Sequence, residues 1–189
     1  MNCYRTFENV PKGANLTIYC FLVELALWRL EHKGNFPVEI FAQFDGGSEN
    51  ANQYVLAILE LIVARHMVKK IDYARLVKGH THTDVDGGFG SIWNCCKTVP
   101  MLTVDSFRKL VENHFKDTKL AVKVFDVLVI PDYCKWLGPC IDPHLANYAR
   151  LEQTQHCWRF ESRIPSTSYP LGVKTCYRAY CSDKVRNVG

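Results

Sequence analysis

Strand-like and helix-like runs alternate in FPVEIFAQFDGGSENANQYVLAILELIVARHMVKKIDYARLVKGHTHTDVDGGFGSIWNCCK, residues 36–97. Apolar and polar side chains alternate over Phe36–Phe44, which predicts a strand. An apolar run over Asn50–Val68 predicts a buried helix, with Asn50 as a candidate N-cap. A short strand is expected at Asp72–Lys78. A further helix is expected at Asp84–Lys97, begun by carboxylates that suit its dipole.

The flanking residues extend this pattern in both directions. Asn15–His32 is apolar on nearly every face and predicts a buried helix, so residues 15–97 have the order α-β-α-β-α. Such alternation favours an α/β fold, with a parallel sheet covered by helices. The later elements form a C-terminal α+β extension: an amphipathic helix at Val104–Phe115 capped by Thr103 or Asp105, a strand at Ala121–Ile130, a Pro- and Gly-interrupted connection at Pro131–His144, and a hairpin of Cys157–Arg163 and Val173–Cys181. A composition shift near residue 100 suggests domains at 13–100 and 101–189.

The composition is that of a globular protein and narrows the function classes. The chain has 189 residues, 48% hydrophobic and 22% charged, with a net charge of +4 that permits contact with nucleic acid without arguing for it. Nine cysteines contain no CxxC pair, which argues against a zinc ribbon and for reduced thiols in a nuclear or cytoplasmic protein. The apolar run Leu16–Leu30 carries Glu24 and Arg29 and is too short to span a bilayer, so no membrane partner is expected.

Acidic residues follow both strands of the 36–97 stretch. Asp45-Gly-Gly-Ser-Glu49 comes directly after the first strand, and Gly-His-Thr-His-Thr-Asp-Val-Asp comes after the second. Ligand sites of open α/β sheets lie beyond the carboxyl ends of the strands, so we expect the two junctions at one edge of the sheet. The residues at the second junction with metal-ligating side chains are His80, His82, Asp84 and Asp86.

These side chains suit a metal-dependent phosphoryl-transfer site. Such sites gather carboxylates around two divalent ions about 4 Å apart. We expect Asp45 to bridge the ions, Asp86 to bind one and Glu49 to assist. His80 or His82 would orient a phosphate or move a proton. Oxygen ligands favour Mg²⁺ or Mn²⁺ as the cofactor. We therefore expect the Asp45 and Asp86 carboxylates to lie about 4–8 Å apart.

Each of these residues also has an ordinary structural role. Asp84 suits an N-cap and Asp86 a first-turn partner of the helix dipole. Asp45 before two glycines suits a turn, and Glu49 suits a solvated or capping position. The two histidines suit hydrogen-bonded loop positions. The joint occurrence of all these residues after two successive strands is what favours a metal site.

Three runs of this sequence resemble a known family. They are FAQFDGGSENANQYVLAILELIVAR, VKGHTHTDVDGGFGSIW, and VFDVLVIPDYCKWLGPCIDPHL followed by HCWRFES. They resemble an uncharacterised domain of transposon-derived reading frames, which is similar to the DDE transposase and integrase group. The resemblance, from about residue 13 to 183, implies a partial ribonuclease-H-like sheet and DNA as the partner. It implies that Asp45 matches the second catalytic acid and that Asp86, or else Asp84, matches the third.

In that group the first catalytic aspartate lies on the first of three antiparallel strands that precede the first helix. Residues 1–14 are too few for three strands, so we expect the first aspartate and part of the sheet to be missing, in a fragment, in a decayed element or in a chain completed by a partner. The strand at 36–44 should then be a sheet edge, with an exposed apolar patch beside helix 15–32. We expect a homo-oligomer or a completing chain, and little nuclease activity from this chain alone.

Three functions follow from these observations. The first is a remnant or fragment of a DDE-type metal-dependent nuclease acting on DNA. The second is a non-catalytic nucleic-acid- or protein-binding domain. The third is an unrelated zinc or iron metallohydrolase that uses His-x-His-x-Asp, residues 80–84. Metal preference separates them, because Mg²⁺ or Mn²⁺ supports the first and tight Zn²⁺ binding the third.

Overall fold

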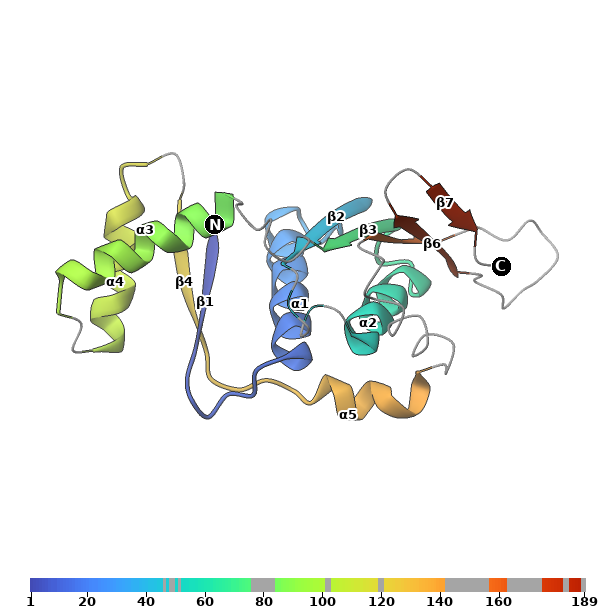
Figure 1. The fold of residues 1–189 in the computed structure, drawn as a ribbon, viewed down its shortest axis with the longest axis horizontal. Coiled ribbons are helices and arrows are strands. Elements are labelled where there is room, and N and C mark those ends of the chain that lie inside the picture. Colours follow the sequence, from blue (N-terminus) through green and yellow to red (C-terminus); the bar gives the residue numbers. More distant parts are fainter. Residues whose placement is uncertain are drawn as a thin grey trace. The chain divides into compact units, whose positions relative to one another are not determined.

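The computed structural model describes residues 1–45, 47, 50, 52–75, 84–100, 103–118, 121–141, 157–162, 175–181 and 184–187. The chain divides into two compact units, and Figure 1 labels most of their elements. Unit 1 comprises residues 1–11 and 81–130, and unit 2 comprises residues 12–80 and 131–189. The units are therefore interleaved along the chain, whereas the composition suggested a division near residue 100.

Unit 2 contains a mixed sheet with the strand order β2-β3-β5-β6-β7. β2 (Glu39–Phe44) and β3 (Lys70–Arg75) are parallel, as the α-β-α-β pattern predicts. β5 (Cys157–Ser162) is antiparallel to β3 and to β6 (Thr175–Cys181), which confirms the predicted hairpin. β7 (Lys184–Asn187), antiparallel to β6, was not predicted.

Two helices, α1 (Ala14–Glu31) and α2 (Gln53–Ala64), lie on one side of β2 and β3 (Figure 1). Residues from both helices and from three strands bury a common apolar core. Its largest fully buried side chains are Trp158, Tyr73, Phe160, Ile18, Leu56, Leu59, Ile71, Val55, Val63 and Val68. This core sets the distance between the helices and the sheet, and it thereby positions the loop that connects β2 to α2.

A third helix packs on the same core. The Pro- and Gly-rich connection predicted after residue 130 contains α5 (Tyr133–Leu137) and a 3₁₀ turn (Gly138–Cys140). Asp132 caps α5 by accepting a hydrogen bond from the Lys135 backbone N–H at 3.0 Å. The Asn15 side chain accepts another from the Cys134 backbone N–H at 2.9 Å. A contact 119 residues distant along the chain holds this short helix, so local patterns could not predict it.

The prediction of an exposed apolar patch at β2 and α1 is confirmed, and the prediction of a wholly buried α1 is wrong. Only Ile18 and Leu25 of α1 are buried, while Trp28 is 44% exposed. β2 is the terminal strand of the described sheet, and Phe41 is 70% exposed. An all-round apolar helix is fully buried only when protein covers every face, and the described residues leave Trp28 and Leu30 of α1 exposed.

Unit 1 is built from β1 (Asn2–Thr6), α3 (Asp84–Thr98), α4 (Val104–Phe115) and β4 (Lys123–Val127). β1 and β4 are parallel and form a two-stranded sheet, so residues 1–14 contain a strand that the sequence did not predict. α4 has its predicted bounds and begins with a capping box, in which Thr103 and Ser106 exchange hydrogen bonds. The buried residues of this unit's core are Cys3, Ile92, Val111, Phe115, Val122 and Val124.

The described residues thus form a mixed α/β structure with five α-helices, α1–α5, and two small sheets. Within the described ranges, no helix is both long and apolar enough to cross a membrane.

Candidate functional site at the carboxyl ends of β2 and β3

The parallel register places the ends of β2 and β3 at one edge of the sheet. Phe44 and Arg75, the last residues of the two strands, are register partners. Asp45 follows β2 directly, and the chain leaves β3 at the same edge toward the His80–Asp86 segment. The prediction that both junctions begin at one edge is therefore confirmed for the strand ends.

The exposed Asp45 carboxylate is held by its own loop. Its Oδ1 accepts a hydrogen bond from the Gly47 backbone N–H at 2.9 Å and another from the Asn50 side-chain amide. The Asn50 backbone N–H in turn donates to the Gly47 carbonyl at 3.2 Å. An aspartate whose side chain accepts a hydrogen bond from the backbone N–H two residues ahead forms an Asx-turn. The structure therefore confirms that Asp45 has the turn role that its sequence suggested.

Asn50 connects this loop to α1 and to β3. Its side-chain oxygen accepts a hydrogen bond from the Thr17 hydroxyl of α1 at 2.9 Å. Its backbone carbonyl accepts a short hydrogen bond from the hydroxyl of Tyr73, a residue of β3 that is only 1% exposed. The orientation of the Asp45 carboxylate is therefore supported by α1, by β3 and by its own turn, which is the support that a ligand-binding side chain needs.

The start of α2 lies just beyond this loop. Asn52, rather than the predicted Asn50, is the N-cap, and its side chain accepts hydrogen bonds from the Tyr54 and Val55 backbone N–H groups at 3.0 and 3.1 Å. The prediction for Asn50 was wrong because its side-chain amide donates to Asp45 and its oxygen binds Thr17.

The other predicted site residues are not brought to Asp45 by the described structure. Asp86 is exposed on α3 in unit 1, whereas Asp45 belongs to unit 2. Asp84 is the first residue of α3, and its side chain lies outside the described residues, as do Glu49, His80 and His82. Among the side chains that are described, no three His, Cys, Asp or Glu residues gather to hold a metal ion. A shared ion between Asp45 and Asp86 therefore stays a prediction.

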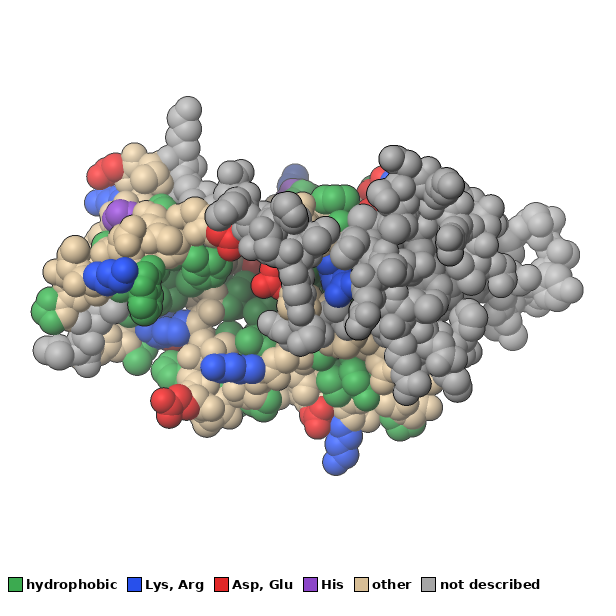
Figure 2. All heavy atoms as spheres, viewed as in Figure 1, with side chains coloured by type: hydrophobic (Ala, Val, Ile, Leu, Met, Phe, Trp, Pro, Cys, Tyr) green, Lys and Arg blue, Asp and Glu red, His purple; other side chains and the backbone are tan. Residues whose placement is uncertain are grey.

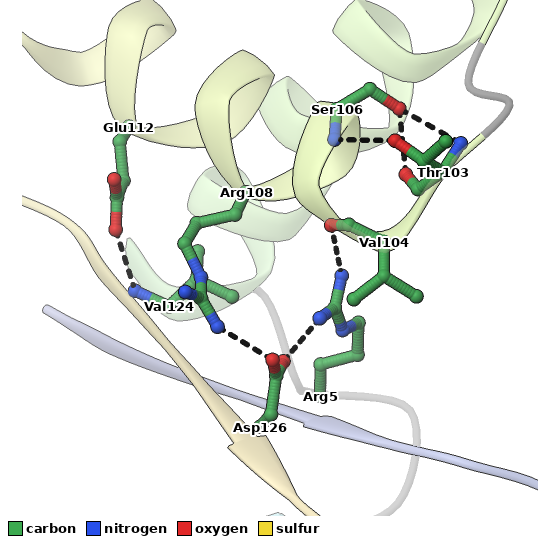
Figure 3. Close-up of polar contacts among 8 residues, drawn as sticks. All are labelled: Arg5, Thr103, Val104, Ser106, Arg108, Glu112, Val124 and Asp126. Carbon is green, nitrogen blue, oxygen red and sulfur yellow. Dashed lines mark hydrogen bonds and ion pairs between the residues drawn. The ribbon is translucent and has the colours of Figure 1, made fainter.

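A second polar cluster, in unit 1, was missed by sequence reasoning (Figure 3). Asp126 of β4 lies between Arg5 of β1 and Arg108 of α4, and its two carboxylate oxygens bind one guanidinium each. Arg5 also donates to the Val104 carbonyl at 2.5 Å, and its guanidinium packs over the Phe107 ring at 5.5 Å. These contacts join β1 to α4 and β4, with Arg5 and Asp126 lying 121 residues apart in the sequence, which points to a structural tie.

The described cysteines range from buried Cys3 to exposed Cys140. Those with described side chains are free thiols: Cys3, Cys20, Cys95, Cys96, Cys134 and Cys140. Burial, and then the nearby Glu24 carboxylate, raises the pKa of Cys20 to about 11. Burial likewise raises the pKa of Cys96, with a smaller contribution from Cys95. Cys96 also packs against the core of unit 1, and protonated thiols are poor nucleophiles, so Cys96 fits core packing better than redox chemistry.

These features define a mixed α/β protein with a hydrogen-bonded carboxylate, that of Asp45, at the carboxyl end of a parallel strand pair. The chain belongs to the family described as "Domain of unknown function (DUF7869)", which matches residues 1–169. Searches of curated proteins and of solved structures find no match.

Proposed function

We propose that this chain derives from a metal-dependent DDE-type nuclease with a ribonuclease-H-like core, acting on DNA. The observation that carries the proposal is the placement of Asp45. It is a supported carboxylate at the end of β2, in the order α1-β2-α2-β3-α3, and the chain leaves β3 at the same edge of the sheet. The DDE group that the sequence resembles has an acidic residue at each of these two positions.

In this proposal Asp45 binds Mg²⁺ or Mn²⁺ together with Asp86, or with Asp84. Among the described residues, both hydrogen bonds to Asp45 end on Oδ1, and in this proposal Oδ2 acts as the metal ligand. Both ions favour such oxygen ligands and keep several waters, which would contact a phosphate. His80 or His82 would orient that phosphate, and Glu49 would assist.

DNA contact in this proposal depends on the metal site more than on a broad basic surface. On the face drawn in Figure 2, the blue and red side chains of the described residues are interspersed. The net charge of +4 is small for the whole chain. A mixed surface gives little long-range attraction for a polyanion, so the ion would supply most of the local positive charge.

Nuclease activity of this chain alone should be low. The DDE group uses three acidic residues, and the proposal assigns two of them here. A third carboxylate from another strand or another chain would complete the site. Robust DNA cleavage that disappears in Asp45→Ala would instead mean that a further carboxylate of this chain already serves.

Metal binding tests the proposal directly. We expect Asp45→Asn to weaken Mn²⁺ binding at least tenfold in calorimetric titration, because a neutral amide replaces a charged ligand. Asp117→Asn, at an exposed position in unit 1, is the matched control and should leave the affinity unchanged. Equal Mn²⁺ affinity in all three proteins would contradict the proposal. Tight Zn²⁺ binding lost in His80→Ala would favour the metallohydrolase.

A non-catalytic protein-binding domain is the second candidate. The observation that favours it is the exposed apolar edge at β2, since an exposed apolar patch of this kind marks an interaction site. Binding of a partner protein that needs no metal ion and is unaffected by Asp45→Asn would support this candidate over the first.

A further inference from the structure

We propose that a second copy of this chain pairs with the first along the outer edge of β2, in antiparallel register, so that the two sheets become continuous. The inference concerns the surface formed by β2 and the neighbouring part of α1, named here the β2 edge. It does not depend on a metal site, because it would hold equally for a catalytic and for a non-catalytic protein.

The backbone of β2 supplies the first reason. β2 bonds to β3 on one side, and no strand among the described residues pairs with its other side. Every second residue of such a strand directs its N–H and C=O outward, and these groups form a template for another strand. Pro37 precedes β2 and lacks an N–H, so it limits the available stretch to about Val38–Phe44.

Apolar side chains border this edge on both faces of the sheet. On the helix side, a groove of about 310 Å³ is lined by Phe21, Leu25, Trp28, Pro37 and Ile40, with Glu24 and Glu39 at its margin. Phe41, which alternates with Ile40 and so lies on the opposite face, is 70% exposed, and Val38, just before the strand, is 68% exposed. A strand added to β2 would therefore cover apolar surface on both faces at once.

Charge favours an identical strand as the occupant. Glu39 is the one ionisable residue of β2, and its carboxylate binds the Lys70 ammonium, which also raises the pKa of Lys70. Antiparallel pairing centred on Phe41 sets Glu39 opposite Gln43 of the copy and Ile40 opposite Ala42. No like charges then face one another across the pair, so an identical edge meets no repulsion, whereas an acidic side chain of a foreign strand placed opposite Glu39 would be repelled.

The exposed apolar area of the β2 edge sets the expected strength of the dimer. Taking about 150–250 Å² for a large side chain, the exposed fractions of Trp28 (44%), Val38 (68%) and Phe41 (70%) amount to roughly 350 Å² per copy. The backbone and the groove margin add to this. A standard interface buries about 800 Å² per partner, so we expect a weak, reversible dimer with a roughly micromolar dissociation constant.

Sedimentation velocity of the full chain over a wide concentration range tests the proposal. The unmodified protein should pass from monomer to dimer as its concentration rises. Phe41→Lys should raise the dissociation constant at least tenfold, because it places two ammonium groups opposite each other. Leu128→Lys is the matched control, since Leu128 is 65% exposed and lies outside the β2 edge; it should leave the dissociation constant unchanged.

Mixing two variants distinguishes pairing at the β2 edge from a loss of folding. Phe41→Lys and Phe41→Glu should each be monomeric alone and should form a dimer when mixed, since opposite charges then face each other. Three results would each overturn the proposal: a monomer at every concentration of unmodified protein, an equal effect of Phe41→Lys and Leu128→Lys, or no dimer in the mixture.

Discussion

At the scale of single residues, Asn50 explains why Asp45 is suited to bind a ligand. Asn50 binds the Asp45 carboxylate, the Thr17 hydroxyl and the Tyr73 hydroxyl. A carboxylate on a free loop would lose conformational entropy when it takes up a ligand, and this loss is reduced when the loop is already tied to α1 and β3. The asparagine thus contributes to the candidate site without being a candidate ligand.

Asp126 illustrates a residue whose role is structural. Its side chain is 21% exposed and separates two guanidinium groups, that of Arg5 being only 15% exposed. We expect Asp126→Ala to lower the free energy of unfolding by about 2–3 kcal/mol, because two partly buried cations then face each other without a carboxylate. The shift of the urea unfolding midpoint measures this loss.

The control for that measurement is Asp105→Ala. Asp105 pairs with Lys109 one turn along α4 at 2.8 Å, and both side chains are largely exposed. Exposed pairs of this kind contribute little, so we expect no measurable shift of the midpoint. Equal effects of the two substitutions would show that the Asp126 cluster does not hold unit 1 together.

At the scale of the elements, the N-cap of α2 gives a prediction. Asn52 satisfies two backbone N–H groups of the first turn. We expect Asn52→Ala to lower the free energy of unfolding by about 1 kcal/mol, and Asn52→Gly by only a few tenths, because glycine leaves these groups open to water. Chemical denaturation of the two variants provides the test, and an effect of glycine larger than that of alanine would contradict the assignment.

The elements that the sequence predicts well are those with strong local periodicity. α1, β2, α2, β3, α3 and α4 all overlap their predicted ranges, and the bounds of α4 agree at both ends, whereas β3 begins at Lys70, two residues before its predicted start. Two of the missed elements, β1 and α5, depend on distant contacts. β1 is a five-residue strand whose partner β4 begins at Lys123, and α5 is held by Asn15. Such short segments have no periodicity that distinguishes them from loops.

The same reasoning applies to the candidate site. The position of Asp45 at a strand end was predictable, because the parallel order determines where β2 and β3 end. Its supporting contacts were not, since Asn50-Ala-Asn52 offers two asparagines and the local sequence does not show which one caps the helix. The Arg5–Asp126–Arg108 cluster left no signal at all, because its members are 121 and 18 residues apart.

At the scale of the whole molecule, each unit draws on two separate segments of the chain. Unit 1 joins residues 1–11 to 81–130, and unit 2 joins residues 12–80 to 131–189. Local patterns predict elements within a segment but not which segments associate. Pairing over such distances also costs loop-closure entropy, which apolar burial in the two cores must offset.

The central claim is that Asp45 and Asp86 bind one divalent ion together, and a crystal structure grown with Mn²⁺ tests it most directly. Anomalous difference density should show an Mn²⁺ ion within about 2–2.3 Å of an oxygen of each carboxylate, at the edge where β2 and β3 end. The density at this position should be absent in Asp45→Asn. Carboxylates at opposite edges of the sheet, or an ion bound by only one of them, would contradict the claim.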